Sequence, residues 1–336
     1  MKKGLLLVMS ASMMLVGCSS NTGHANVGLF YCSAEANSLY QVTVVKKELE
    51  DKGLTTKLIS FSDSNDISSV LNGSIDSVDA LYIPTDNACA SNASIIDEVA
   101  KAKKKPVFAG EEGICEGCGE ITLSISYYNI GVKTGQMAID VLLGKKNIAE
   151  MPIQDDDNPV KKYDKAKCEL LGITPPSGYV PLDDPDSRPV PTVEFENTSN
   201  KQFTIGISQF VAHDALDAAT KGFMDAVKIG LGESNVTFDL KNAAGQSELC
   251  STIANTFVSH NVDLIMANAT PCLQAAANST DKIPVLGTSV TEYGIALGIK
   301  DFNGTVGTNV SGTSDLAPLA EQANMLATVF SSFMKK

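Results

Sequence analysis

Two stretches of this chain, residues 27–112 and 203–292, repeat one pattern of apolar and polar segments. Each begins with a strand-like apolar run, passes through a polar loop into a helical segment, and reaches a second apolar run, at residues 78–83 and 262–267. A polar elbow, a further helix and a strand led by proline follow in both. Strands that alternate with helices in this way predict parallel sheets with right-handed crossovers. The repeat therefore predicts two similar lobes with a ligand held between them.

The length of 336 residues leaves room for two such lobes, each with its own core. We expect the first lobe over residues 26–154 and the second over residues 201–330. Residues 155–200 carry runs of Asp, Pro and Gly around one short helical piece, which indicates a tail and an interdomain linker. The expected fold class is α/β, with two doubly wound parallel-sheet lobes.

The N-terminus has the pattern of an export signal. Two lysines precede an apolar run over residues 5–16 that is too short to span a bilayer, so residues 1–17 are expected to be a signal peptide. The run ends in Leu-Val-Gly-Cys, which resembles the lipobox of bacterial lipoproteins and implies lipidation at Cys18. Residues 18–25 then form a flexible tether. We expect an extracytoplasmic protein with a lipid anchor in the bacterial cell membrane.

Charge and motifs limit the chemistry. The formal net charge is −13, which argues against nucleic acid as a partner. The chain has no Ser-His-Asp order, no metal-binding helix motif and no phosphate-binding loop. We therefore expect no enzyme, no cofactor and no metal site.

Polar side chains gather where the predicted strands end, which is the edge of a parallel sheet at which ligands bind. Hydroxyls and backbone N–H groups at helix N-termini suit a carboxylate, and acidic side chains suit an ammonium group. The loops therefore predict a site for a zwitterion, although the same residue types also cap helices without any ligand. The candidate binding residues are Ser33, Glu35, Asn37, Ser38, Thr85, Asp86, Asn87, Glu111 and Tyr128 in the first lobe, and Ser208, Gln209, Thr270, Pro271, Thr288, Ser289 and Thr291 in the second.

Several of these loops resemble a single family. Residues 207–213, 269–271 and 314–318, together with 33–38, 82–87 and 108–111, resemble the tryptophan/tyrosine-type substrate-binding lipoproteins of bacterial ABC transporters. The resemblance implies a type I periplasmic-binding-protein fold and capture of a small solute, often an aromatic amino acid. It also implies a permease in the membrane as the partner that receives the solute.

We assign roles to the candidates on this basis. Thr270, Ser289 and Gln209 are expected on the carboxylate side of the ligand. Asp86, Glu35, Asn37 and Glu111 are expected on its amine side, with Tyr31 or Tyr128 as aromatic neighbours. His213 is expected to be a hydrogen-bonded residue at a helix start rather than a ligand contact.

The chain departs from the family in the order of its lobes. The lobe that comes second in the family stands first here, which indicates either a circular permutation or a segment of a tandem duplication. Tyr293 stands where the family commonly has Pro, and Asp214 replaces a usual Pro after His213. These substitutions affect the ligand assignment more than the fold.

Seven cysteines follow Cys18, an odd number that cannot all pair within one chain. Cys115 and Cys118 form a CxxC in a Gly-rich stretch, where we expect a loop with a local or cross-loop disulfide. Free thiols and a metal or redox role are the alternatives. Two further functions remain open: a ligand-sensing lipoprotein that signals without transport, and a thiol-redox lipoprotein that uses Cys115 and Cys118.

Overall fold

A computed structural model describes residues 25–156, 158–184, 189–198 and 200–334. The expected signal peptide, the lipidation site at Cys18 and all but the last residue of the tether lie outside this part of the chain. Among the described residues, no helix is both long and apolar enough to cross a membrane.

The first lobe is built on a seven-stranded sheet in the order β2-β1-β3-β4-β5-β6-β7. Its strands are β1 (Ala25–Cys32), β2 (Thr56–Phe61), β3 (Val78–Ile83), β4 (Val107–Ala109), β5 (Ile121–Ser124), β6 (Val160–Tyr163) and β7 (Val180–Pro181). Neighbouring strands are parallel except β5 and β6. The accompanying helices are α1 (Ala36–Asp51), α2 (Ile67–Ser74), α3 (Asn87–Ser91), α4 (Ala93–Ala102), α5 (Glu112–Cys118) and α7 (Lys165–Leu171).

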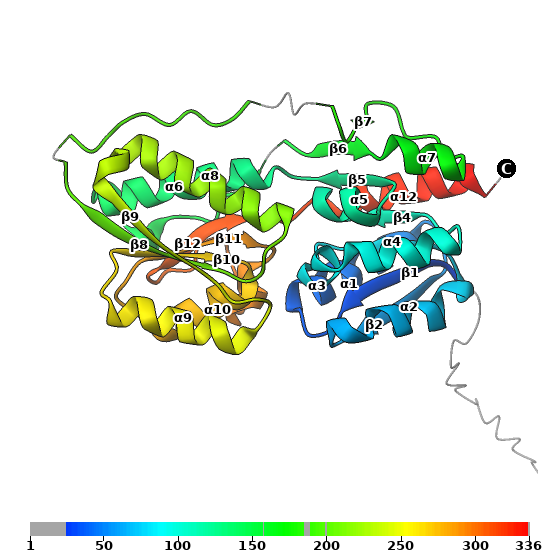
Figure 1. The fold of residues 1–336 in the computed structure, drawn as a ribbon, viewed down its shortest axis with the longest axis horizontal. Coiled ribbons are helices and arrows are strands. Elements are labelled where there is room, and N and C mark those ends of the chain that lie inside the picture. Colours follow the sequence, from blue (N-terminus) through cyan, green and yellow to red (C-terminus); the bar gives the residue numbers. More distant parts are fainter. Residues whose placement is uncertain (1–24, 157, 185–188, 199, 335–336) are drawn as a thin grey trace, which may run out of the picture.

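The second lobe has a five-stranded parallel sheet in the order β12-β11-β10-β8-β9. Its strands are β8 (Phe203–Gln209), β9 (Val236–Asn242), β10 (Leu264–Asn268), β11 (Val285–Val290) and β12 (Val310–Ser314). The helices are α8 (Asp214–Leu231), α9 (Ser247–Ser259), α10 (Thr270–Ser279) and the short α11 (Tyr293–Leu297). The two lobes lie side by side (Figure 1). The structure is thus the two-lobed α/β fold with two mainly parallel sheets that the repeat predicts.

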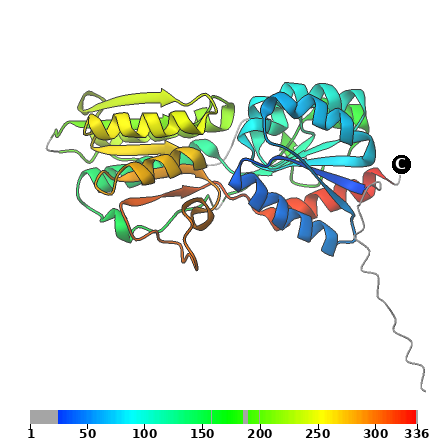
Figure 2. The ribbon, with the colours of Figure 1, turned by 90° about the horizontal axis from the view of Figure 1, so that it is seen from below.

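Two helices cross between the lobes. Helix α6 (Tyr127–Leu142) follows β5 of the first sheet, yet it packs against α8 and the second sheet. Helix α12 (Leu319–Phe333) follows β12 of the second sheet and packs beside α1 in the first lobe (Figures 1 and 2). Residues 26–154 and 201–330 therefore each give one helix to the other lobe.

Glycine allows α6 and α8 to approach closely. A Cβ atom on Gly131 of α6 would lie 2.1 Å from the carbonyl oxygen of Ala219, and one on Gly222 of α8 would lie 2.1 Å from that of Tyr128. Both contacts are with backbone, which cannot rotate away. The crossing fixes α6 on the second lobe and requires glycine at these two positions.

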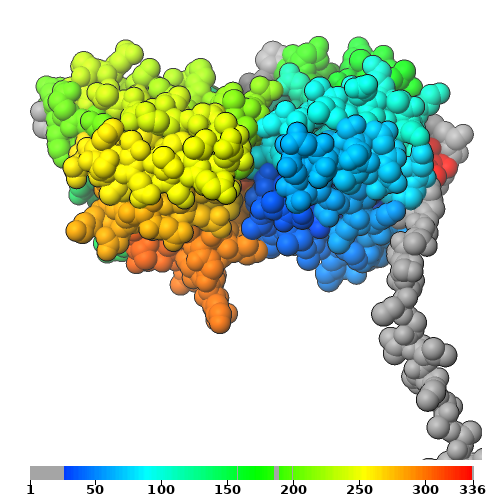
Figure 3. Space-filling view, turned by 60° about the horizontal axis from the view of Figure 1, so that its bottom comes forward, coloured from blue at the N-terminus to red at the C-terminus, as the bar shows by residue number. Residues whose placement is uncertain are grey.

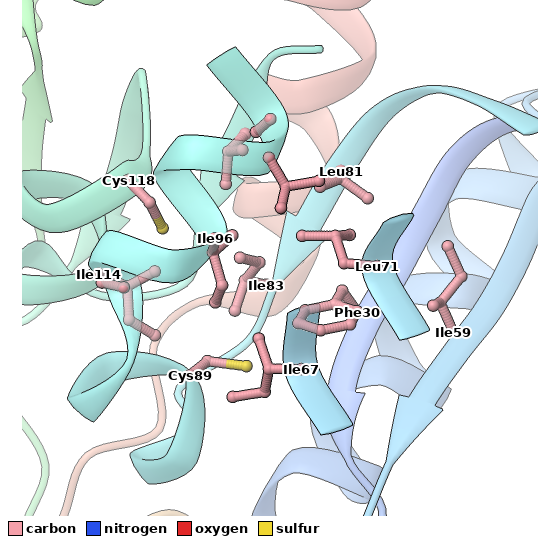
Figure 4. Close-up of a cluster of buried hydrophobic side chains, with 14 of the residues drawn as sticks. Phe30, Ile59, Ile67, Leu71, Leu81, Ile83, Cys89, Ile96, Ile114 and Cys118 are labelled. Carbon is pink, nitrogen blue, oxygen red and sulfur yellow. The ribbon is translucent and has the colours of Figure 1, made fainter. Parts of the chain in front are cut away.

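The cysteines of the CxxC lie in a helix, contrary to the predicted loop. The Glu111 side chain accepts hydrogen bonds from the backbone N–H groups of Gly113 and Ile114, and this cap starts α5 despite its glycines. Cys115 and Cys118 are free thiols buried in an apolar cluster, so the expected disulfide is absent (Figure 4). Burial raises the pKa of both thiols well above the ordinary value, which disfavours the thiol-redox alternative.

Candidate ligand-binding site

A small cavity lies between the lobes, where the carboxyl ends of strands from both sheets meet. It has room for about one water molecule. The lining residues are Asn37, Thr85, Asp86, Asn87, Ala90, Glu111, Tyr127, His213, Leu216, Ser289 and Asp315. The space-filling view shows the two lobes in contact along a seam (Figure 3). Both lobes supply its walls.

A larger groove of about 300 Å³ lies beside it, and Asn87 lines both spaces. First-lobe residues Cys32, Glu35 and Ala88 form one wall of the groove. Phe210 and Pro271 of the second lobe lie in the opposite wall. This volume is at the lower end of the range of small-molecule pockets.

Asp86 is buried and holds two chain segments together. One carboxylate oxygen accepts from the backbone N–H of Cys89 at 2.8 Å and caps α3, and the other accepts from that of Cys32 at 2.7 Å. Burial raises the pKa of Asp86, while these two hydrogen bonds oppose the shift. The residue is therefore both a helix cap and a wall of the cavity.

Glu35 lies at the same end of α3. Its carboxylate accepts from the backbone N–H groups of Asn87 at 3.1 Å and Ala88 at 2.9 Å, and from the Asn87 side-chain amide at 2.7 Å. Burial, followed by the nearby charge of Asp86, raises the pKa of Glu35 to about 8. Glu35 faces the groove and orients Asn87.

Glu111 and Asp315 complete the acidic wall. Glu111 caps α5, and burial raises its pKa to about 7. Asp315 accepts from the hydroxyls of Thr291 at 2.9 Å and Tyr127 at 3.0 Å, and burial raises its pKa to about 6. The carboxylates of Asp86, Glu111 and Asp315 thus border one cavity that has no Lys or Arg in its wall.

This wall suits a cationic group. His213 has the one titratable nitrogen among the lining residues, and burial lowers the pKa of His213 to about 4. Within the described part of the chain, no three His, Cys, Asp or Glu side chains are grouped to hold a metal ion. An ammonium group, which only donates hydrogen bonds, matches the acceptors of the cavity.

Three polar atoms of the cavity walls lack partners. In the described part of the chain, the buried side-chain atoms without a hydrogen bond are Asn37 Oδ1, Thr122 Oγ1, His213 Nδ1, Asn268 Oδ1 and Ser289 Oγ. Asn37, His213 and Ser289 all line the cavity. Buried polar atoms are normally paired, so this concentration in one small space marks the cavity as a candidate binding site.

Most other predicted first-lobe residues support this end of the sheet. Ser38 donates to the Thr85 carbonyl at 3.3 Å, and Ser33 donates to the Phe61 carbonyl at 3.0 Å. Tyr128 does not join the group, because its hydroxyl donates to Asp225 of α8, outside the cavity. Tyr31 packs in the core beside α1.

The second-lobe candidates divide in the same way. Gln209 is fully engaged, since its amide donates to Asp217 and Val211 and accepts from Thr220. The hydroxyls of Ser208 and Thr288 make hydrogen bonds inside the lobe. Thr270 is buried at the start of α10, and Pro271 lines the groove. Of the predicted second-lobe hydroxyls, Ser289 is the one that lines the cavity without a partner.

Tyr127, Asp315 and His213 were not among the predicted binding residues. Tyr127 and Asp315 lie where the chain passes between lobes, directly after β5 and β12. The sequence pattern that could identify them is a polar or aromatic residue directly after a strand, where the chain passes from one lobe to the other. For Asp315 it was hidden, because β12 itself was not predicted.

Three non-glycine residues at the carboxyl edge of the second sheet, Ala244, Ala269 and Ser289, have positive φ angles. Ala269, which precedes α10, has φ 86°, and Ser289 near the end of β11 has φ 54°. Such conformations favour glycine and cost about 1–3 kcal/mol each. Strained backbone of this kind concentrates at ligand-binding sites.

Comparison with known proteins shows similarity to substrate-binding proteins of ABC transporters. A family model described as ABC transporter substrate binding protein matches residues 23–177 and 204–335. A tyrosine-binding protein of Clostridioides difficile (strain R20291) is 40% identical over 133 residues, which are 39% of this chain and 38% of that protein. The match thus spans well under half of that relative.

Two solved structures are also similar. A carbohydrate transporter solute-binding protein of Agrobacterium radiobacter in complex with D-arabinose matches 94% of this chain and 90% of its own, with a TM-score of 0.58 and 12% identity. An ABC domain in complex with L-Trp from Streptococcus pneumonia is 29% identical over 46% of this chain and 56% of its own, with a TM-score of 0.44. The first of these establishes the two-lobed fold over nearly the whole chain.

Proposed function

The chain belongs to the ABC transporter substrate binding protein family, and we propose that it captures an amino acid, in the first place an aromatic one, for an ABC importer. The family binds substrates for transport and is not a family of enzymes. The ligand would lie between the lobes, and the closed form would be recognised by a permease in the membrane.

One observation supports the site above all others. The cavity between the lobes is bordered by three partnerless polar atoms and three buried carboxylates, from both lobes. The ammonium group of a zwitterionic solute would pair with the carboxylates, Asn37 Oδ1 and His213 Nδ1, and its carboxylate would accept from the Ser289 hydroxyl. A sugar would leave the carboxylates without a compensating charge. The site therefore favours an amine over the carbohydrate that binds to the more distant structural relative.

The two spaces suit the two ends of an aromatic amino acid. An ammonium group is about the size of the water molecule that the cavity admits. The adjoining groove of about 300 Å³ offers Phe210, Val211 and Pro271 to an aromatic ring. The tyrosine specificity of the Clostridioides difficile relative agrees with this ligand class.

Roles within the site follow from the available atoms. Asn37, Asp86 and Glu111 serve the ammonium side in this proposal, joined by Asp315. Ser289 and Thr270 serve the carboxylate side. Gln209, which is fully engaged within its lobe, positions that side instead of contacting the ligand.

The protein's location and lobe order are part of the same proposal. The signal sequence and lipobox support export and an anchor at Cys18, and the order of the family motifs supports a circular permutation.

The experiment is a calorimetric titration of the mature protein with all twenty amino acids and a panel of sugars. We expect heat of binding from tyrosine, tryptophan or phenylalanine, and a rise in melting temperature with the same ligands. Binding of a sugar with no response to any amino acid would refute the proposed ligand class. Binding of aliphatic amino acids alone would refute the aromatic assignment.

A further inference from the structure

The atoms around His213 fix which of its ring nitrogens carries the proton. Nε2 of His213, at the start of α8, lies 3.2 Å from the side-chain oxygen of Asn87 in the first lobe. That oxygen can only accept, so Nε2 must donate. The neutral ring then has its lone pair on Nδ1.

The orientation of Asn87 is fixed in turn by Glu35. The Asn87 side-chain nitrogen donates to the Glu35 carboxylate at 2.7 Å, which turns the Asn87 oxygen towards His213. Glu35 is itself held by the backbone N–H groups of Asn87 and Ala88. The series Glu35, Asn87, His213 therefore runs across the interface between the lobes and selects one tautomer.

Nδ1 is the free end of this series. It is buried, it has no hydrogen-bond partner, and its residue lines the cavity bordered by Asp86, Glu111 and Asp315. A lone pair in such a place needs a donor, and an ammonium group is a donor of the size that the cavity admits.

We propose that His213 is a specificity-determining ligand contact, whose Nδ1 accepts a hydrogen bond from the ammonium group of the bound solute. The proposal rests on the proposed function. It also couples ligand binding to closure of the lobes. The Asn87–His213 hydrogen bond, which leaves Nδ1 as the acceptor, forms only when the lobes are in contact. A ligand whose nitrogen has no hydrogen to donate would leave Nδ1 unpaired.

Charges around the ring are consistent with a neutral acceptor. Burial lowers the pKa of His213 to about 4, and this outweighs Asp217 and Asp214 of α8, whose charges favour the protonated ring. The ring is therefore neutral at physiological pH and available to accept. Protonation would place a second cation beside the ammonium group.

Two substitutions separate the two ring nitrogens. In His213→Asn the side-chain oxygen can take the place of Nδ1 as an acceptor, whereas in His213→Gln the side-chain amide nitrogen can take the place of Nε2 as the donor to Asn87. Each is titrated with the aromatic amino acid that wild type binds best. We expect the Gln variant to bind roughly 10- to 100-fold more weakly, since it loses a hydrogen bond to a charged donor, and the Asn variant to retain most of the affinity. His260→Asn, at the exposed end of α9, is the matched control and should bind as wild type does.

A spectroscopic measurement tests the contact itself. In protein labelled with ¹⁵N-histidine, ligand should shift the Nδ1 resonance of His213 and leave its Nε2 protonated, while the resonances of His260 stay in place. Binding of an amino acid with no change at Nδ1, or with equal affinities in both variants, would overturn this inference and leave the proposed function intact. If wild type binds no amino acid at all, the proposed function fails first.

Discussion

Ser289→Ala offers the most direct test of the binding cavity, because the substitution removes one atom that has no partner in the protein. The Ser289 hydroxyl is buried between the lobes and borders the cavity. Burial of an unpaired polar group costs about 1–3 kcal/mol, so the free protein should be as stable without it, or more stable. The ligand-bound protein should lose a hydrogen bond to a charged group, worth about 1.5–3 kcal/mol.

These two terms predict a dissociation constant raised roughly 10- to 100-fold, with an unchanged or higher melting temperature of the free protein. The assay is calorimetric titration beside thermal unfolding without ligand. Thr122→Val is the matched control, since Thr122 also has a buried, unpaired hydroxyl but lies on β5 away from the cavity lining. Its removal should leave affinity unchanged.

An affinity loss of equal size in both variants would mean that general packing, not a ligand contact, is measured. Unchanged binding in Ser289→Ala would refute the argument that a ligand pairs with this hydroxyl. A drop in the melting temperature of free Ser289→Ala would mean that the hydroxyl has a partner within the protein.

Three further outcomes follow from the structure. Burial raises the pKa of Glu35 from 4.5 to about 8 and that of Glu111 to about 7, so the folded ligand-free protein retains protons that the unfolded chain has released. The free energy of unfolding, measured with urea, should therefore fall as the pH rises from about 5 to about 8, and a flat profile would contradict these shifts. Gly131→Ala should lower the free energy of unfolding by about 1–3 kcal/mol, because the added methyl group forces α6 away from α8. Gly73→Ala is the control: it lies on α2 with open space around it and should raise the free energy of unfolding by about 0.5–1 kcal/mol. Equal effects of the two substitutions in urea unfolding would refute the close crossing of α6 and α8. Ala269→Gly should raise the melting temperature by releasing about 1 kcal/mol of backbone strain, and a lower melting temperature would show that no strain is stored there.

The sequence predicts most of the parallel strands, because alternating apolar runs and helices leave a periodic signal. It does not predict β9 or β12, nor β6 and β7, which lie in the segment expected to be a tail and linker but belong to the first sheet. The apolar run at residues 78–83 is strand β3, with the same bounds. The single helix expected after the polar elbow of the first lobe is in fact two, since the helix is interrupted at Asn92 between α3 and α4. Strand β12 was missed because its sequence, VSGTS, is small and polar rather than apolar.

The site was harder to predict, because side chains of the same type serve different purposes. Asp86 and Glu111 were predicted as ligand residues, and the structure gives both a second role as helix caps. Gln209 and Ser289 both lie at or near the carboxyl ends of strands, but only Ser289 has an unpaired side-chain atom at the cavity. Contacts between the lobes decide which polar side chain at a strand end remains without a hydrogen-bond partner. These contacts join residues far apart in the sequence, so no local sequence pattern predicts them.

Closure of the lobes is coupled to ligand recognition through the segments in which the chain passes from one lobe to the other. Tyr127 follows the crossing after β5, and Asp315 follows β12 at a second crossing; the Tyr127 hydroxyl donates to Asp315 at 3.0 Å. Both residues line the cavity, so an ammonium group placed there contacts the segments about which the lobes must turn. A ligand shifts such an equilibrium only by its difference in affinity for the open and closed forms. Residues of both lobes line the cavity, so the full set of hydrogen-bond acceptors is present only in the closed form. The ligand therefore has a higher affinity for the closed form, and its binding favours closure.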